Sequence, residues 1–166
     1  MNRTPTLPTF GAHVPGAGSY LSAIMRGPMV NGVRQPDYAL IAANVPGILM
    51  PWGEYGQKVK DCDSLTDGLA NTRAMLKAKC PPAVHLAGIE IEGHKDWYLP
   101  ARAELWAAYA NTPELFAKVI HWSSTQSSSY GAFAQDFEYG YSDWYGKDYQ
   151  RLVRPFRRIH LYHFPA

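Results

Sequence analysis

The segment DWYLPARAELWAAYAN, residues 96–111, marks the boundary between an extended run and a helix. Pro100 has no backbone N–H to donate, so it ends the extended run. A helix is predicted to begin near Ala101, with Glu104 at the position that closes a capping box onto the backbone. Ala101 lacks the hydroxyl that completes such a box, which weakens the cap by about 1 kcal/mol. The apolar face of this helix follows the i, i+3, i+4 spacing and consists of Leu105, Ala108 and Tyr109.

Upstream of this segment, two strands, one helix and a short helical turn at residues 84–88 are predicted. The apolar runs at residues 37–45 and 47–52 are typical of short buried strands. A helix is predicted to begin at Thr66 or Asp67 and to stop before Pro81, because an acid suits its first turn and lysines suit its last. Its expected packing face consists of Leu69, Ala70, Ala74 and Leu76.

Downstream of this segment, alternation replaces helical spacing. Residues 132–137 place alternate side chains on opposite faces, which is the period of a strand. Residues 139–147 carry glycine, serine and aspartate between aromatic rings, which indicates turns. Residues 151–164 predict a terminal strand, with Pro155 at an edge or a bulge. Two helices with short antiparallel strands and long loops make an α+β fold.

Size and composition favour one domain. The chain has 166 residues, a net charge of +2 and only 18% charged residues, so we expect no nucleic-acid partner. No apolar run is long enough to cross a bilayer, so we expect no membrane insertion. Residues 1–18 are broken by proline and glycine, which predicts an extended arm rather than a secretory signal, followed by a single domain at residues 19–166. Cys62 and Cys80 are expected to be free thiols.

The stretch SSTQSSSYGAFAQDFEYGYSDWYGKDY, residues 123–149, concentrates aromatic rings among serines and glycines. Such rings either fill a core or form a binding surface, because Tyr and Trp offer a large contact area with few rotatable bonds. The rings expected in the core are Trp122, Phe137 and Phe156. The rings expected at the surface, where they alternate with turn residues, are Tyr130, Tyr139, Tyr141, Trp144 and Tyr145.

Several blocks of sequence together carry a family resemblance. They are TDGLANT at 66–72, HKDWYLPARAEL at 94–105, HWSST at 121–125, GYSDWYGKDY at 140–149 and VRPFRRI at 153–159. In this order they resemble the C-terminal domain of bacterial collagen-like adhesins, a family also found in phage tail proteins. The resemblance covers roughly residues 37–160. The family helix usually opens with Ser or Thr where this chain has Ala101, and residues 1–36 match no family pattern.

The resemblance implies a C-type-lectin-like fold, in which two helices and small sheets support variable loops. It implies a non-catalytic recognition module on a phage virion, at a tail fibre or baseplate tip, that binds a host cell-surface glycan or protein. A structural virion protein whose aromatic surface packs against neighbouring subunits is the alternative, and an oxidase related to sulfatase-activating enzymes fits less well because both cysteines precede residue 81. Relatives with trimeric tips suggest a homotrimer, and the N-terminal arm is expected to contact other virion proteins.

The expected ligand-binding residues all lie in or next to the aromatic stretch. They are Gln126, Ser128, Tyr130, Phe133, Gln135, Tyr139, Tyr141, Asp143, Trp144, Tyr145 and Lys147. We expect no metal site, because the sugar-binding motifs of calcium-dependent lectins are absent although Asp136, Glu138, Asp143 and Asp148 could supply oxygens. No cofactor and no catalytic residue is expected, since Glu90, Glu92, His94 and Asp96 are read as solvated or structural groups.

A run of cations lies near the C-terminal end of the sequence. It consists of Lys147, Arg151, Arg154, Arg157 and Arg158. Arginine can clamp the carboxylate or phosphate groups of an acidic polysaccharide. These side chains could equally pair with acids of the same chain, and the sequence leaves both possibilities open.

Overall fold

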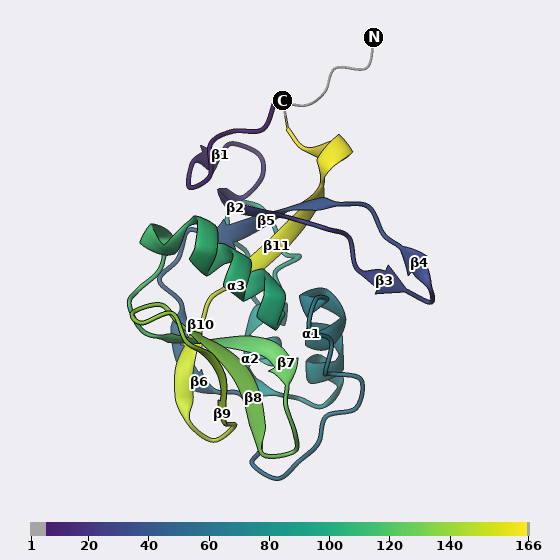
Figure 1. Ribbon diagram of the computed structural model, residues 1–166, viewed down its shortest axis with the longest axis vertical. Helices are drawn as coiled ribbons and strands as arrows, with labels where there is room; N and C mark the ends of the chain where they lie inside the picture. Colours follow the sequence, from purple (N-terminus) through teal and green to yellow (C-terminus); the bar gives the residue numbers. More distant parts are fainter. Residues whose placement is uncertain (1–5, 166) are drawn as a thin grey trace.

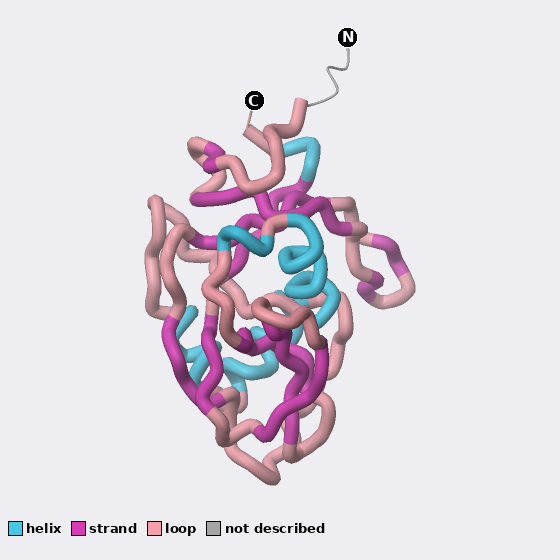
Figure 2. The backbone as a smooth tube through the Cα atoms, turned by 60° about the vertical axis from the view of Figure 1, so that its left-hand side comes forward, coloured by secondary structure: helices cyan, strands magenta, loops and turns pink. Residues whose placement is uncertain are grey.

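A computed structural model describes residues 6–165 and shows a mixed α+β architecture built on two main sheets (Figure 1). The first sheet has the order β1 (His13–Val14), β2 (Ser19–Met25), β5 (Tyr38–Ala43), β11 (Phe156–His160). The second has the order β6 (Ile48–Pro51), β10 (Gln150–Val153), β7 (Ile120–Gln126), β8 (Gly131–Asp136), β9 (Ser142–Gly146). A small hairpin, β3 (Met29–Val30) and β4 (Val33–Arg34), projects from the first sheet (Figures 1 and 2).

Strand β5 confirms the strand predicted at residues 37–45 and is buried on both faces. On one face of the sheet, Tyr38, Leu40 and Ala42 belong to a hydrophobic cluster that includes residues of the helix at 102–111. Ala39 and Ile41 pack on the opposite face. Alternating side chains of a strand point to opposite faces, so a continuous apolar run is what a sheet covered on both sides requires.

Three α-helices occur among residues 6–165: the two that were predicted, and a third where only a short helical turn at residues 84–88 was predicted. They are α1 (Gly68–Lys77), α2 (Pro81–Ala87) and α3 (Arg102–Asn111), and short 3₁₀ helices follow as η1 (Pro113–Leu115) and η2 (Leu161–His163). The Pro81-Pro82 pair ends α1 as predicted, but proline is also tolerated in the first turn of a helix, so the same pair starts α2.

The packing face predicted for α1 was wrong in part. Its buried residues are Gly68, Asn71, Thr72 and Met75, whereas Leu76 is exposed. Asp67 caps this helix by accepting a hydrogen bond from the Ala70 N–H at 3.1 Å. Polar residues lie on the buried face because they hydrogen-bond there: the Asn71 amide, for example, donates to the Ser64 carbonyl at 2.8 Å.

Helix α3 begins where the sequence predicts, with Ala101 as its N-cap. The Glu104 carboxylate accepts a hydrogen bond from the Ala101 N–H at 3.0 Å, which is the half of the capping box that this sequence can make. The same carboxylate accepts from the Gly68 N–H at 2.9 Å. One buried acid therefore caps α3 and fixes the start of α1 beside it.

The terminal strand predicted at residues 151–164 is two strands in two different sheets. Strand β10 ends at Val153 in the second sheet, and β11 begins at Phe156 in the first. Pro155, predicted at an edge or a bulge, lies in the crossing between them, where no ladder hydrogen bond from its nitrogen is needed. The crossing links the two sheets close to the chain's C-terminal end (Figure 1).

The described part of the predicted arm, residues 6–18, lies against the first sheet. Its strand β1 pairs with β2, and Val14 and Ala17 are buried. Leu7 packs against the same cluster. These residues are thus part of the domain's own packing, while residues 1–5 of the predicted arm lie outside the described residues. No helix in the described part of the chain is both long and apolar enough to cross a membrane.

Candidate functional site

Five large rings with half or more of their surface exposed lie on or beside the hairpin formed by β8 and β9 (Figure 1). They are Tyr130, Tyr139, Tyr141, Trp144 and Tyr149. Of the rings predicted to be exposed, Tyr145 differs, because it is half-buried and packs against the core. The three rings predicted to be internal, Trp122, Phe137 and Phe156, are buried as expected.

Strand register explains which rings of the hairpin face outward. Residues 139–147 were predicted to be turns, but Ser142–Gly146 form β9, which pairs with β8 so that Phe133 lies opposite Trp144. Ala132 and Ala134 point into the core, so the alternate positions Phe133 and Trp144 share the opposite face. Gly131 makes room for the Trp144 ring, since a Cβ at position 131 would lie 2.6 Å from Trp144 Cε3.

The outer face of the hairpin is fixed by Arg102 from α3. Its guanidinium lies 3.9 Å from the centre of the Phe133 ring. Its Nε donates to Ser142 Oγ and its Nη2 donates to the Ser142 carbonyl, both at 2.9 Å. Beside it opens a cavity of about 380 Å³ lined by Leu65, Arg102, Ala103, Trp106 and Ser142. A rigid helix thus holds the face that presents Trp144.

At the β7–β8 end, two loops far apart in sequence bring two tyrosines together. The rings of Tyr55 and Tyr130 lie 5.1 Å apart between centroids. The Gly56 N–H donates to the Ser129 carbonyl at 2.9 Å, which joins the two loops. Tyr55, 58% exposed, was not among the predicted site residues, and no local pattern around residue 55 indicates this pairing.

At the β8–β9 end, the turn that carries Tyr139 and Tyr141 is held by Asp136. Its Oδ1 accepts from the N–H groups of Glu138 at 2.8 Å and Tyr139 at 3.2 Å. Gly140 has φ +83° and lies against Tyr109, where a Cβ would meet the Tyr109 hydroxyl at 2.7 Å. The exposed rings of this turn therefore stand on an ordered backbone.

Three predicted ligand-binding residues are inside the protein, and that part of the prediction was wrong. Lys147 Nζ donates to Gln126 Oε1 at 2.7 Å and to the Gln57 carbonyl at 2.6 Å. Gln126 also accepts from the Val59 N–H at 2.7 Å, so these side chains fasten the 57–59 loop to the second sheet. Gln135 is buried as well. Polar residues between exposed rings turn inward here because buried loop backbone needs hydrogen-bond partners.

The remaining predicted site residues lie at the surface to different degrees. Ser128, Tyr130, Tyr139, Tyr141, Asp143 and Trp144 are exposed, and Phe133 and Tyr145 are half-buried. By their positions along the strands, the exposed rings belong to both ends and to the outer face of the hairpin.

The C-terminal run of cations is mostly turned inward. Arg157 pairs with Asp96, with Nε 2.8 Å from Oδ1, and Arg158 pairs with Asp67 at 3.2 Å. Arg154 donates to the carbonyls of Ala43 and Leu115, and burial lowers its pKa to about 10. Together with buried Lys147, four of the five cations serve this chain's own structure.

The fifth cation, Arg151, lines a groove of about 520 Å³ between β10 and the β8–β9 turn. Its guanidinium carbon lies 5.2 Å from the centre of the Tyr145 ring and 5.3 Å from that of Tyr149. The groove is lined by Leu49, Lys118, Val119, Ile120, Asp136, Glu138, Tyr139, Gln150 and Arg151. One aromatic ring, Tyr139, and two cations, Lys118 and Arg151, therefore line one concave surface.

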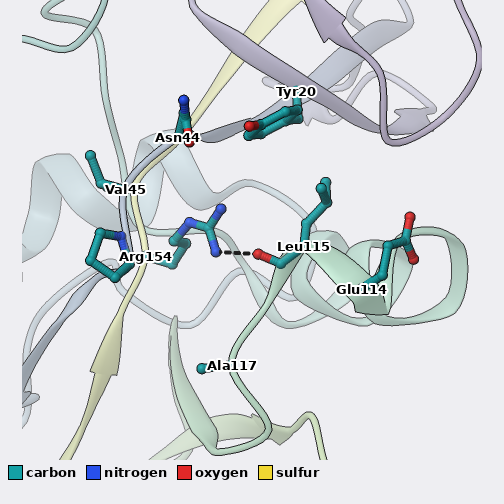
Figure 3. Close-up of a pocket in the computed structure, with 8 residues that line it drawn as sticks. Tyr20, Asn44, Val45, Glu114, Leu115, Ala117 and Arg154 are labelled. Carbon is teal, nitrogen blue, oxygen red and sulfur yellow. Dashed lines mark hydrogen bonds between the residues drawn. The ribbon is translucent and has the colours of Figure 1, made fainter.

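A separate cavity of about 400 Å³ lies between the 44–46 loop and η1 (Figure 3). Arg154 reaches across it to the Leu115 carbonyl at 2.7 Å, and Glu114 points away from that contact. The lining carries one carboxylate, Glu114, and one phenol, Tyr20, beside Arg154, and the guanidinium is engaged by backbone carbonyls rather than by that acid.

The two thiols are unsuited to nucleophilic chemistry. Cys62 and Cys80 are free and buried, and burial raises the pKa of Cys62 to about 12. The thiolate is the reactive form of cysteine, so a protonated thiol shielded from solvent does not attack a dissolved substrate.

The acids and histidine near residue 92 make structural contacts. Glu92 accepts hydrogen bonds from Ser19 at 2.6 Å and from His13 at 2.5 Å, and these bonds lower its pKa. Ser19 is fully buried, and its hydroxyl donates to Glu92 while accepting from the Asn44 N–H at 2.8 Å, so both contacts join segments of the chain. Within residues 6–165, no three His, Cys, Asp or Glu side chains gather closely enough to hold a metal ion.

The geometry thus provides exposed rings on an ordered hairpin and a groove with one arginine. Comparison of the sequence with protein-family models finds no match, and comparison with curated proteins finds none either.

Proposed function

We propose that this protein is a non-catalytic recognition module with a C-type-lectin-like architecture. The observation that carries the proposal is the set of exposed rings on β8, β9 and the adjoining loops, held outward by Arg102, Asp136 and Gly140. Rigid aromatic side chains bind foreign surfaces at a low entropic cost, because few torsions are lost on contact.

The proposed setting is a phage virion, at a tail fibre or baseplate tip, where the module binds a host cell-surface glycan or protein. The support for this setting is the resemblance of five sequence blocks to the adhesin domain family, above all 66–72 and 94–105. The structure gives these two blocks a common role, because Glu104 in the second caps α3 and hydrogen-bonds Gly68 in the first. A homotrimer is part of the same proposal.

The test replaces three exposed rings together, Tyr139, Tyr141 and Trp144, by alanine. None of these rings is buried, so the folded state is expected to persist while adsorption to host cells falls at least tenfold. Adsorption is measured with labelled protein on host cells and on a glycan array. The matched control is Tyr162→Ala, an equally exposed tyrosine on η2 near the C-terminus, away from the hairpin (Figure 1). Unchanged adsorption by a folded triple variant contradicts the proposal.

A second candidate function, a structural virion protein, is favoured by the projecting β3–β4 hairpin. Met29, Val30 and Val33 are exposed there and are remote from the core clusters. Apolar residues on a protruding hairpin suit contact with a neighbouring subunit. Replacing Met29 and Val33 by serine is expected to abolish particle incorporation if the hairpin is an assembly contact, and to leave adsorption by the isolated domain unchanged. Normal incorporation of that variant argues against the structural role.

A further inference from the structure

Two arginines seven positions apart occupy similar aromatic settings. Arg158 lies 4.5 Å and 4.9 Å from the centres of the Tyr38 and Tyr98 rings. Arg151 lies 5.2 Å and 5.3 Å from the centres of the Tyr145 and Tyr149 rings. Each guanidinium is thus bordered by two phenol rings, which orient its flat face and leave its edge for hydrogen bonding.

The two sites differ in what meets the guanidinium edge. Arg158 Nη2 lies 3.2 Å from Asp67 Oδ1 and 3.6 Å from Glu104 Oε2. Arg151 forms no ion pair with any acid of residues 6–165. Its one side-chain hydrogen bond runs from Nη1 to the neighbouring Gln150 carbonyl at 3.2 Å, and its buried Nε has no partner. We call the surroundings of Arg158 the inner site and those of Arg151 the outer site. The outer site therefore has an arginine and two rings but, within the described residues, no carboxylate paired with the guanidinium.

Arg151 lines a solvent-facing groove without an acid partner among the described residues, and its buried Nε leaves the guanidinium incompletely hydrogen-bonded. A buried N–H without an acceptor costs about 1–3 kcal/mol, so such groups in folded proteins usually meet a partner. A carboxylate that approaches the Nη1 and Nη2 edge from the groove can take two parallel hydrogen bonds. The groove of about 520 Å³ that Arg151 lines is large enough for a sugar-sized group.

The charges of the groove favour a ligand with a single negative charge. Lys118 and Arg151 contribute two cations to the lining, and Asp136 and Glu138 contribute two acids. The lining charges sum to zero, so a ligand with one negative charge meets less repulsion from the two acids than a dianionic phosphate does. Exposed Tyr139 borders the groove and exposed Tyr149 lies against Arg151, so an apolar ring face can stack beside the anion.

We propose that this groove binds a hexuronic acid residue of an acidic polysaccharide, with Arg151 taking the sugar carboxylate through its Nη1 and Nη2. The inference rests on the proposed recognition function and names its ligand class. Tyr139 contacts the sugar ring, Tyr149 flanks the guanidinium, and Tyr145 holds the guanidinium in place from the core side.

The experiment measures binding of short galacturonate, glucuronate and mannuronate oligomers to the full chain by isothermal titration calorimetry. At least one of them is expected to bind, and its methyl ester, which keeps the sugar and removes the charge, is expected to bind at least tenfold more weakly. Arg151→Gln is expected to lose at least tenfold in affinity. Arg151→Lys keeps the charge without the flat fork and is expected to fall between Arg151→Gln and the unmodified protein.

The matched control is Arg73→Gln, an exposed arginine on α1 outside the groove, which is expected to bind as the unmodified protein does. Near-UV circular dichroism of each variant checks that the hairpin remains folded. Binding of none of the three uronate oligomers, equal binding of the methyl ester, or equal binding by Arg151→Gln overturns the inference.

Host adsorption separates this inference from the proposed function. If Arg151→Gln adsorbs normally and the triple variant of Tyr139, Tyr141 and Trp144 does not, recognition stands and the acidic-sugar site is wrong. If neither variant loses adsorption, both proposals fail.

Discussion

Arg158 and Arg151 show how the same residue type serves stability in one place and is left available in another. Arg158 is enclosed between the first sheet and the helices, where burial by itself lowers its pKa. The neighbouring Tyr98, Glu104 and Tyr38 outweigh that effect and raise the pKa of Arg158. Arg151 lies between two rings at the surface with no acid to satisfy it. A charge in the interior requires a partner from the chain itself, whereas a charge at a groove can take one from outside.

The inner site is centred on Glu104, which is fully buried. Its Oε2 accepts from the hydroxyls of Tyr38 at 2.8 Å and Tyr98 at 2.5 Å. Its Oε1 accepts from the backbone of Gly68 and Ala101. Burial, followed by the charge of Glu104, raises the pKa values of both tyrosines, which therefore stay protonated as donors. Every acceptor position of this carboxylate is used to join the helices to the first sheet.

The largest expected effect comes from Glu104→Gln. The amide replaces an oxygen that accepts hydrogen bonds with a group that donates them, and it leaves Arg158 with less compensating charge. We expect a loss of about 3–5 kcal/mol in the free energy of unfolding, measured by urea denaturation. Glu138→Gln, an exposed acid in the β8–β9 turn, serves as the control and should change that free energy by no more than about 0.5 kcal/mol. A loss near that of the control would mean that the inner site does not organise the fold.

His121 shows what the interior does to an ionisable group that has no acid beside it. Its ring packs against Phe116 and Phe137, and its Nδ1 bonds the Val119 carbonyl at 2.9 Å. Burial, reinforced by the nearby charge of Arg154, lowers the pKa of His121 to about 4. The neutral form is therefore the one that the folded protein holds.

This depressed pKa predicts a loss of stability in mild acid. Below about pH 6.5 the unfolded chain binds a proton at His121 that the folded chain does not. The contribution of His121 to the free energy of unfolding is therefore full above that pH and is lost as the pH falls toward 4. We expect this residue to account for about 3 kcal/mol between pH 7.5 and pH 4. Comparing urea denaturation of the unmodified protein with His121→Phe at the two pH values isolates the effect. Parallel pH profiles would show that His121 is not responsible.

Lys147 is intermediate between Arg158, which pairs with acids, and Arg151, which has no acid partner in the described part of the chain. It is a buried cation whose hydrogen-bond acceptors are neutral oxygens. Its Nζ, 4.7 Å from the centre of the Trp52 ring, bonds Gln57 and Gln126. Lys147→Met keeps the length of the side chain and leaves the Gln57 carbonyl without this donor, so we expect a loss of about 1–2 kcal/mol in unfolding free energy. Its affinity for a ligand on the hairpin should not change, because the side chain is buried. Weaker binding with unchanged stability would return Lys147 to the list of ligand-binding residues.

The smallest stability effect is expected for Arg151→Gln. The variant removes contacts with two rings near the surface, which are worth about 0.5–1 kcal/mol. Thermal denaturation of this variant, set beside Glu104→Gln, sharpens the comparison: the inner site should govern stability and the outer site should govern ligand affinity. A loss as large as that of Glu104→Gln would make Arg151 a structural residue.

Local signals in the sequence predicted most elements of the fold. Pro100 and Glu104 locate α3, Asp67 locates α1, and the apolar run at 37–45 locates β5. Each of these signals acts within a few residues, through a cap, a missing N–H or a side-chain period. The third helix was predicted only as a short turn at residues 84–88, because the Pro81-Pro82 pair signals both a stop and a start.

The candidate site was predicted less completely. Exposure of Tyr139, Tyr141 and Trp144 follows from rings set among turn residues, and the structure confirms it. The inward positions of Gln126 and Lys147 could not be predicted locally, because their partner is the loop at 57–59, far away in sequence. Tyr55 was missed for the same reason, since only a loop pairing brings it to Tyr130.

The amino-acid sequence by itself determined the α+β class, the caps of two helices and the excess of rings in one stretch, because these depend on neighbouring residues. Only the tertiary structure decided which charges are satisfied: it gave Asp67 and Glu104 to Arg158, Asp96 to Arg157 and no acid to Arg151. Ion pairing depends on distances between segments that are far apart in sequence, and those distances exist only once the sheets and helices have packed.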